Sequence, residues 1–179
     1  WDLGKGYAKE KEFGFLIQTY LQIQVMILRK AKKILTYNNA NIDYFKELAP
    51  GKEVVALGNT IDTERIYEVK RKNILANDIP DRILKQEKIF LYVGALNEKK
   101  KVHEFSQILK YCTNFGLIII GEGEEKYKTQ LKKSLIGVNY VMVGYKTIEE
   151  LAYYYRISDL LILPGLGGLT IMQSYMFEV

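Results

Sequence analysis

The chain has 179 residues, and its hydrophobic content of 48% is usual for a globular protein with a buried core. Lysine and arginine outnumber the acidic residues by 26 to 21, and the net charge of +5 favours anionic partners such as nucleoside diphosphates, nucleic acid or an acidic membrane face. Cys112 is the only cysteine and His103 the only histidine, so the sequence excludes an intrachain disulfide and disfavours a His/Cys metal site.

The start of the chain shows no pattern of a secretory signal, because charged residues such as Asp2, Lys5 and Lys9 interrupt any apolar core. The most apolar early stretch, residues 13–28, is too short and too polar to span a bilayer, which needs roughly 20 apolar residues. We therefore expect a cytoplasmic protein, with peripheral contact at the inner face of the membrane as an open alternative.

The first third of the chain predicts a small α/β segment followed by a connector. Residues 13–33 carry apolar side chains at helical spacing and end in basic residues, which favours one long helix. A strand at 33–37, a short helix at 41–48 and a strand at 54–57 are expected next. Residues 61–87 are rich in charge and contain Pro80, which indicates a connector with a short helix.

From residue 88 onward, apolar strands alternate with helices. The expected strands cover residues 89–96, 115–120, 138–143 and 159–163. The expected helices cover residues 102–111 and 124–135, then one begins after Thr147, with Glu150 completing a capping box, and a last one follows residues 164–168. Strands that are apolar along their whole length and joined through helices predict an α/β fold with a parallel sheet covered on both faces, a doubly wound Rossmann-like domain.

Ligands of such sheets bind beyond the carboxyl ends of the strands, and each of these ends contains glycine in this sequence. Glycine lets the backbone approach a ligand closely, although ordinary turn geometry also explains any single one. The run PGLGGLTIMQ is the most informative, because a helix N-terminus offers unpaired N–H groups to an anion. A diphosphate at Gly167, Gly168 and Leu169 is one interpretation, and a tight strand-to-helix turn is the other.

A basic cluster follows the first of these strands, in LYVGALNEKKKVHEF. A lysine here can reach the same edge of the sheet and neutralise charge on a departing phosphate. A solvated, lysine-rich helix start explains the same residues equally well.

The order of these segments resembles retaining glycosyltransferases of the glycogen-synthase-like group, which have the GT-B fold. That group's V-G-R-L strand, followed after three residues by K-G, is matched by VGALNEKKKV, which aligns Lys100 with the motif lysine. The segment LIIIGEGEEKY resembles the group's apolar strand that ends in G-x-G. The segment VMVGYKTIEELAYYYRISDLLILPG resembles a later part of the group's pattern, in which V-G, E-L, Y, D and P follow in this order. The close of its N-terminal domain and the crossover resemble KKILTYNNANIDYFKEL and VVALGNTIDTERIY.

The resemblance implies a particular division of the chain. Residues 1–60 would be the C-terminal remnant of the N-terminal acceptor domain, residues 61–87 the interdomain connector, and residues 88–179 a truncated nucleotide-sugar-binding domain. Members of this group are about twice as long, so an incomplete copy is expected. The apolar face of its first helix would then contact further chain or a second copy of the fragment.

The resemblance also implies a hexosyltransferase-type enzyme that moves a sugar from a nucleoside diphosphate sugar to a glycan or lipid-linked acceptor. It implies retention of configuration, no cofactor and no bound metal, with Lys100 and a helix N-terminus in the role of Mg²⁺. The predicted donor-site residues are Gly94, Gly121, Gly123, Val143, Gly144, Tyr145, Gly167, Gly168, Leu169, Thr170 and Gln173. Residues 143–145 would border the base, residues 167–170 would hold the diphosphate, and Gln173 would bind the ribose.

Three positions depart from the group's pattern. Ala95 stands where the motif has an arginine, and the usual pair of glutamates falls on Gly165 and Gln173. A sub-pattern reading P-G-x-x-G-L-(S/T) does occur in the group and resembles this chain. These departures leave a catalytically silent nucleotide-sugar-binding homologue, or an isolated domain, as the alternative function. Nucleic-acid binding rests on net charge alone and is not expected.

Overall fold

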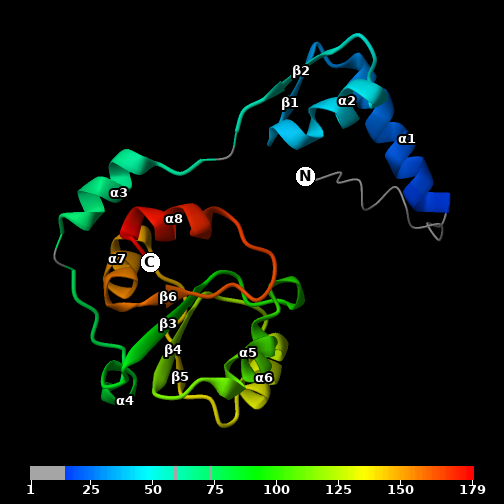
Figure 1. Cartoon of the computed structure of the whole chain (residues 1–179). Coiled ribbons are helices and arrows are strands. Elements are labelled where there is room, and N and C mark those ends of the chain that lie inside the picture. The colour runs from blue at the N-terminus through cyan, green and yellow to red at the C-terminus, as the bar shows by residue number, and fades with distance from the viewer. Residues whose placement is uncertain (1–14, 59, 73) are drawn as a thin grey trace. The chain divides into compact units, whose positions relative to one another are not determined.

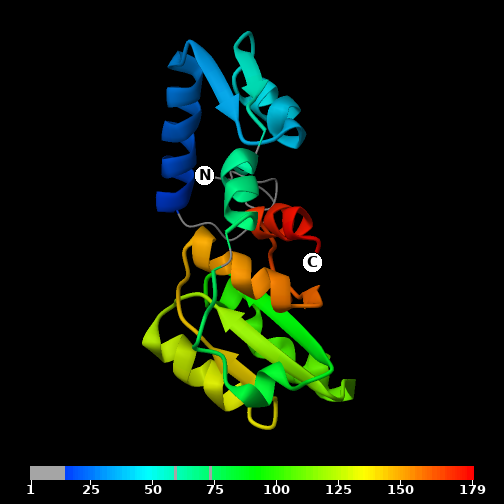
Figure 2. The ribbon, with the colours of Figure 1, turned by 90° about the vertical axis from the view of Figure 1, so that its left-hand side faces the viewer.

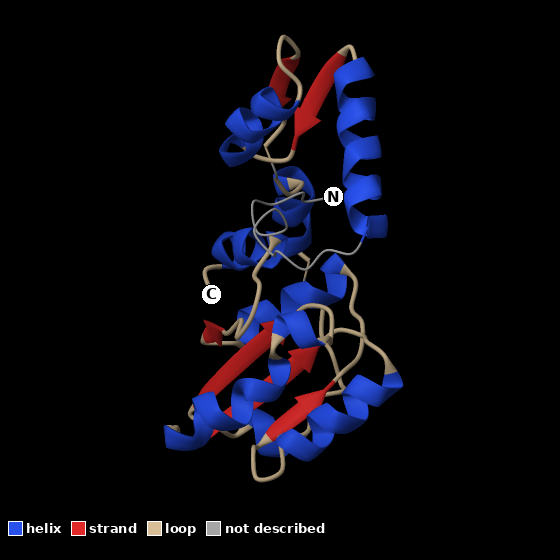
Figure 3. Ribbon diagram, turned by 90° about the vertical axis from the view of Figure 1, so that its right-hand side faces the viewer, coloured by secondary structure: helices blue, strands red, loops and turns tan. Residues whose placement is uncertain are grey.

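The computed structural model describes residues 15–58, 60–72 and 74–179, and the chain divides into two compact units, Trp1–Asn59 and Thr60–Val179 (Figure 1). Both units combine helices with strands (Figure 3). All strand pairs in the described residues are parallel, which requires a crossover connection between consecutive strands. The expected α/β class is confirmed.

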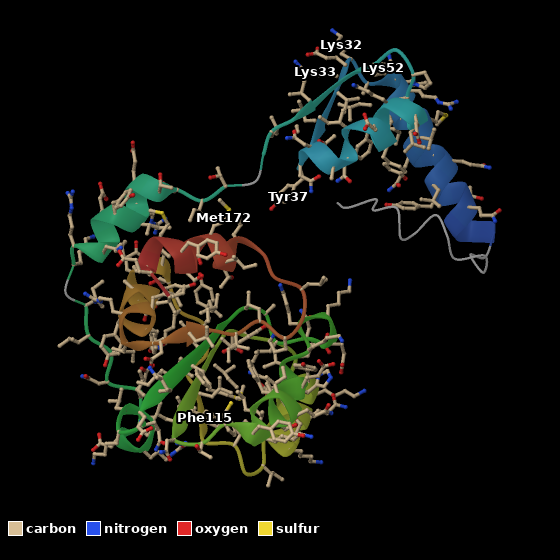
Figure 4. The ribbon with its side chains drawn as sticks, viewed as in Figure 1. Lys32, Lys33, Tyr37, Lys52, Phe115 and Met172 are labelled. Carbon is tan, nitrogen blue, oxygen red and sulfur yellow. The ribbon has the colours of Figure 1, made fainter. Side chains whose placement is uncertain are left out.

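The first unit is built from α1 (Phe15–Lys30), β1 (Lys33–Thr36), a 3₁₀ turn (Asn39–Asn41), α2 (Ile42–Leu48) and β2 (Glu53–Ala56). β1 pairs with β2 in a two-stranded sheet, and Ile34, Ala49 and Val54 form a small buried core. The helix expected at residues 13–33 ends at Lys30, and its first two residues lie outside the described part of the chain. Lys32, Lys33 and Lys52 gather at one end of this sheet (Figure 4).

The second unit contains a four-stranded sheet in the order β5-β4-β3-β6. Its strands are β3 (Lys88–Val93), β4 (Phe115–Ile120), β5 (Tyr140–Met142) and β6 (Leu160–Leu161). Its longer helices are α3 (Thr63–Lys70), α6 (Glu125–Ser134), α7 (Ile148–Ile157) and α8 (Leu169–Phe177), and its shorter ones are α4 (Asp81–Leu84) and α5 (Phe105–Ile108). The prediction of four parallel strands in one sheet is confirmed.

Alternate side chains of each strand point to opposite faces of the sheet, and both sets are apolar. Helices therefore cover both faces. On one face, Leu91 and Ile118 pack with residues of α3, α7 and α8. On the other face, Tyr92 and Leu117 pack with residues of α5 and α6 (Figures 1 and 2). Every position of β4 is buried, which explains why that strand is apolar along its whole length.

The edge strand β6 is shorter than the five residues expected for it. The Asp159 carboxylate accepts hydrogen bonds from the Ile89 N–H at 2.8 Å and from Lys88 Nζ at 2.9 Å. A side chain therefore takes the place of one ladder contact at the start of the strand. Pro164, which has no N–H, follows the strand closely and cannot extend the pairing.

The single helix expected at residues 102–111 is wrong. The chain forms a 3₁₀ turn (Val102–Glu104), the four-residue α5 and a second 3₁₀ turn (Leu109–Tyr111). Lys101 before this region is left-handed, with φ of 54°, which separates it from a further 3₁₀ turn at Glu98–Lys100. Lys99 and Lys100 therefore lie in a turn of their own and not in the first turn of an α-helix.

The described part of residues 61–87 contains two helices, α3 and α4, where one was expected. Ile66 and Val69 of α3 and Ile83 of α4 are buried in the core of the second unit. The expected capping box at α7 is confirmed, since the Thr147 side chain accepts from the Glu150 N–H and the Glu150 carboxylate accepts from the Thr147 N–H.

Candidate functional site

A pocket of about 470 Å³ lies at the carboxyl ends of β3 and β4, and we call it the edge pocket. It is lined by Val93, Gly94, Ala95, Ile120, Gly121, Glu122, Tyr145, Lys146, Ile148, Leu151 and Gln173. The strands supply its floor, and α7 and α8 supply walls. It brings together Gly94, Gly121, Tyr145 and Gln173, four of the predicted donor-site residues, from four segments far apart in the sequence. Its volume is within the range of ordinary small-molecule sites.

A second hollow, of about 700 Å³, lies beside the loop after β3 and the start of α6. Gly123 lines this hollow and not the edge pocket, so the structure does not bring it together with the other predicted residues. Ala95 and Glu122 line both hollows and separate them. Val143 and Gly144 lie next to Tyr145 in the chain but do not line the edge pocket.

Two of the strand-end glycines are required by packing of the loops against each other. A Cβ at Gly121 would collide with the Gly94 carbonyl oxygen, and one at Gly123 would collide with the Leu96 carbonyl oxygen. The Leu96 N–H donates to the Glu122 carbonyl at 2.8 Å, which continues the ladder between β3 and β4 past their ends. Close approach of two backbones, rather than of a ligand, therefore explains glycine at 121 and 123.

In the glycine-rich turn before α8, residues 164–168, the last glycine is not required by packing as Gly121 and Gly123 are. Gly168 is the N-cap of α8 with extended backbone, and a Cβ there would meet no heavy atom within 4 Å among the described residues. Leu169 and Thr170 form the first turn of the helix, whose leading N–H groups cannot be paired within it. Gly167 and Gly168 are exposed at this end of α8, and a helix N-terminus favours an anion.

Lys100 reaches this turn from across the edge of the sheet. Its Nζ donates to the Leu166 carbonyl at 2.6 Å and to the Gly167 carbonyl at 3.4 Å. Asn97 holds the preceding 3₁₀ turn, because its side chain and its carbonyl both accept from the Lys100 N–H. The structure therefore places the predicted lysine beside the predicted diphosphate position.

The structure also shows the contacts of the three residues that depart from the motif, Ala95, Gly165 and Gln173. Ala95 is exposed, and its carbonyl accepts from Tyr92 Oη at 2.8 Å. A Cβ at Gly165 would lie 2.5 Å from the Lys99 carbonyl oxygen. The Gln173 Oε1 is 3.5 Å from the hydroxyl of Tyr155, a fully buried residue whose pKa is raised by burial. That contact leaves the Gln173 amide N–H groups available to the pocket.

The sequence did not identify Glu122, which lines the edge pocket, or Tyr155, which contacts Gln173. The Glu122 carboxylate accepts from Lys128 Nζ at 2.9 Å, and this hydrogen bond lowers the pKa of Glu122, which keeps it ionised. Its Oε1 also lies 3.1 Å from where a Cβ of Gly144 would be. A glutamate between two glycines matches no motif that would assign it to a binding site. A tyrosine on the inner face of α7 matches none either.

Lys146 lines one side of the edge pocket and is held there by an ion pair. Its Nζ pairs with the Asp78 carboxylate at 2.6 Å, and the hydroxyl of Tyr154 donates to the same carboxylate at 2.6 Å. Partial burial alone would raise the pKa of Asp78, but hydrogen bonds from Lys146 and Tyr154 outweigh it, so the pKa is lowered. Lys146 is thereby held at the wall and Tyr145, with 72% of its surface exposed, stands beside it.

In the described residues, no group of three or more His, Cys, Asp or Glu side chains could hold a metal ion. His103 instead lies 3.1 Å from the Tyr127 hydroxyl, and Cys112 is exposed. Within that same part of the chain, no helix is both long and apolar enough to cross a membrane.

Comparison with known families identifies the family of the chain. The model of the family named glycosyl transferases group 1 matches residues 76–176, which include the whole four-stranded sheet, Lys100 and the glycine-rich turn. The chain belongs to this family. Comparison with the sequences of curated proteins finds no match.

Solved structures similar to this member of the glycosyl transferases group 1 family are GT-B glycosyltransferases. Sucrose-phosphate synthase from Thermosynechococcus elongatus is 15% identical with a TM-score of 0.63, over 88% of this chain and 41% of that one. Anabaena Alr3699/HepE in complex with UDP-glucose is 16% identical with a TM-score of 0.65, over 89% and 47%. Trehalose-6-phosphate synthase OtsA is 11% identical with a TM-score of 0.73, over 90% and 46%. The chain thus spans less than half of each, and these likenesses establish the fold.

Proposed function

We propose that the protein transfers a sugar from a nucleoside diphosphate sugar to a hydroxyl of a glycan or lipid-linked acceptor. The observation that carries the proposal is the Lys100 ammonium at the Leu166 and Gly167 carbonyls, beside the open N-terminus of α8. A cation and a helix N-terminus at one turn suit a diphosphate. Membership of the family and the UDP-glucose bound by the similar Anabaena protein support the same donor class.

The edge pocket is the proposed place of the nucleoside. Tyr145 and the adjoining backbone would border the base, and the Gln173 amide would donate to a ribose hydroxyl. Gln173 lies one helical turn beyond Leu169 on α8, so the proposed ribose contact and the glycine-rich turn are on the same helix. Residues 167–170 would then hold the diphosphate through their backbone.

In the proposed reaction, the bond between the anomeric carbon and the phosphate oxygen breaks, and negative charge collects on the departing diphosphate. Lys100 and the first N–H groups of α8 would offset this charge, without a metal ion. The acceptor oxygen forms the new bond to the anomeric carbon on the face that the diphosphate leaves, with retention of configuration. The departing diphosphate takes the proton of the acceptor hydroxyl.

The first unit is proposed to belong to the acceptor side of the enzyme. Lys32, Lys33 and Lys52 lie together at one end of its sheet, where Lys33 Nζ pairs with the Glu53 carboxylate at 2.7 Å (Figure 4). Such a basic surface suits a lipid-linked acceptor presented at an acidic membrane face. Replacing Lys32 and Lys52 by glutamate tests this assignment, because it should abolish sedimentation with vesicles that contain anionic lipid.

Release of free nucleoside diphosphate from a panel of donors, with and without added acceptor, tests the proposed reaction. Acceptor-dependent release supports transfer. Binding of the donor without release would instead favour the silent nucleotide-sugar-binding homologue, for which Ala95 and Gly165 at the motif positions are the supporting observation. Absence of both binding and release would contradict both functions.

A further inference from the structure

Gly165 lies against the main chain of the lysine-bearing turn, and it leaves no room for a side chain. A Cβ at this position would be 2.5 Å from the Lys99 carbonyl oxygen, 2.6 Å from the Lys100 carbonyl carbon and 2.7 Å from the Lys100 carbonyl oxygen. All three atoms belong to backbone, which cannot rotate away as the end of a flexible side chain can. The two turns are therefore in contact at Gly165 because that residue lacks a Cβ.

Hydrogen bonds join the two turns on either side of this contact. The Leu166 N–H donates to the Lys99 carbonyl at 3.3 Å, and Lys100 Nζ donates to the Leu166 and Gly167 carbonyls. A side chain at 165 would push the backbone of Lys99 and Lys100 away by roughly 1 Å, toward ordinary van der Waals separation. The ammonium of Lys100 would then lose its place at the glycine-rich turn, since these hydrogen bonds weaken steeply with distance.

We infer that Gly165 is a positioning residue of the donor site, which holds Lys100 at the diphosphate position by allowing the two turns to touch. The inference rests on the proposed function and explains one of the departures from the motif. A glutamate, which stands at this position in the common form of the motif, has no room here. Gly165→Glu therefore weakens diphosphate binding in this chain and does not restore a missing catalytic group.

Acylation of lysine amines at low conversion, mapped by mass spectrometry on the full chain, tests the contact without any ligand. In the wild-type protein Lys100 should react about tenfold more slowly than Lys99, because about 1.4 kcal/mol of charge-assisted hydrogen bonding protects its amine. Gly165→Ala should bring the rate at Lys100 close to that at Lys99. Gly168→Ala is the matched control, because its Cβ meets no heavy atom within 4 Å in the described residues, and it should leave the rate at Lys100 unchanged. Equal rates at the two lysines in the wild type would overturn the inference, even if the variant failed to fold.

Binding of UDP, with uridine as the phosphate-free control, connects the contact to the site. Gly165→Ala and Lys100→Ala should each weaken UDP binding about tenfold and leave uridine binding unchanged, and the double variant should be no weaker than either single one. Additive losses would mean that Gly165 acts independently of Lys100 and would overturn the inference. A wild-type protein that shows protected Lys100 but binds neither UDP nor other nucleoside diphosphates would support the contact and contradict the proposed function.

Discussion

Replacing Lys100 by alanine removes the cation that faces the glycine-rich turn, and turnover should fall by about 10- to 1,000-fold. Its Nζ is 2.6 Å from the Leu166 carbonyl, and a phosphate oxygen that displaces this carbonyl would be at a similar distance. Because the charge of a phosphate is spread around its phosphorus atom, the two charge centres would be about 4 Å apart, and unit charges at that separation interact by about 4 kcal/mol at an effective dielectric constant of 20, which sets the upper end of the range. Part of the interaction already exists with the bound donor, so on the order of 1.4 to 4 kcal/mol remains for the transition state.

The assay is the rate of nucleoside diphosphate release in the presence of acceptor. Lys99→Ala is the matched control, because it removes the same charge from the neighbouring residue of the same 3₁₀ turn. It should lower turnover much less, and Lys100→Arg should retain part of the rate because it keeps the charge. Equal losses from Lys99→Ala and Lys100→Ala, or no loss from Lys100→Ala, would show that the lysine run is only a solvated turn.

Three further outcomes follow from other parts of the fold. Thr147→Ala removes one half of the capping box of α7 and should lower the free energy of unfolding by about 1 kcal/mol in urea titrations, whereas an unchanged midpoint would refute the role of the cap. The folded-state pKa of Asp78 lies below its ordinary value of 3.8, so its ionised form stabilises the fold above about pH 4, and this contribution disappears as the pH falls through the folded-state pKa. Asp78→Asn should therefore make stability less dependent on pH in the acid range, and a parallel pH profile would exclude this contribution. Ile23 and Ile27 of α1 are exposed, and the chain should associate with itself through this face. Sedimentation velocity should show a monomer after both residues are changed to lysine. A monomeric wild-type chain would contradict the prediction.

The sheet could be predicted from the sequence because its strands carry a strong and local signal. Residues 115–120 are apolar at every position, and the structure buries every one of them on both faces. The position of Lys100 could be predicted for a different reason, since motif alignment placed it opposite the glycine-rich turn. Gln173 was likewise singled out by alignment with the second glutamate of the motif, and the structure puts it in the lining of the edge pocket.

The remaining features depend on how loops approach one another, which no local pattern encodes. A glycine at 121 or 123 is compatible with close approach of either a ligand or another backbone segment, and the sequence does not distinguish the two. The structure shows that the carbonyls of Gly94 and Leu96 occupy the space in question. The change between 3₁₀ and α conformation within residues 102–111, and the left-handed Lys101 that precedes them, have no local sequence signal. Tyr155 contacts Gln173 across two helices, and such pairs have no fixed spacing in sequence.

In the proposed function, the glycine-rich turn and Lys100 bind the diphosphate of a nucleotide sugar. Thermal unfolding of the full chain with UDP, ADP and GDP, each beside its nucleoside, tests it most directly, because a ligand that binds only the folded state raises the melting temperature. At least one diphosphate should raise the melting temperature well above the effect of its nucleoside, and Lys100→Ala should remove that difference. A melting temperature that no diphosphate raises, or that nucleosides raise equally, would contradict diphosphate binding at this turn.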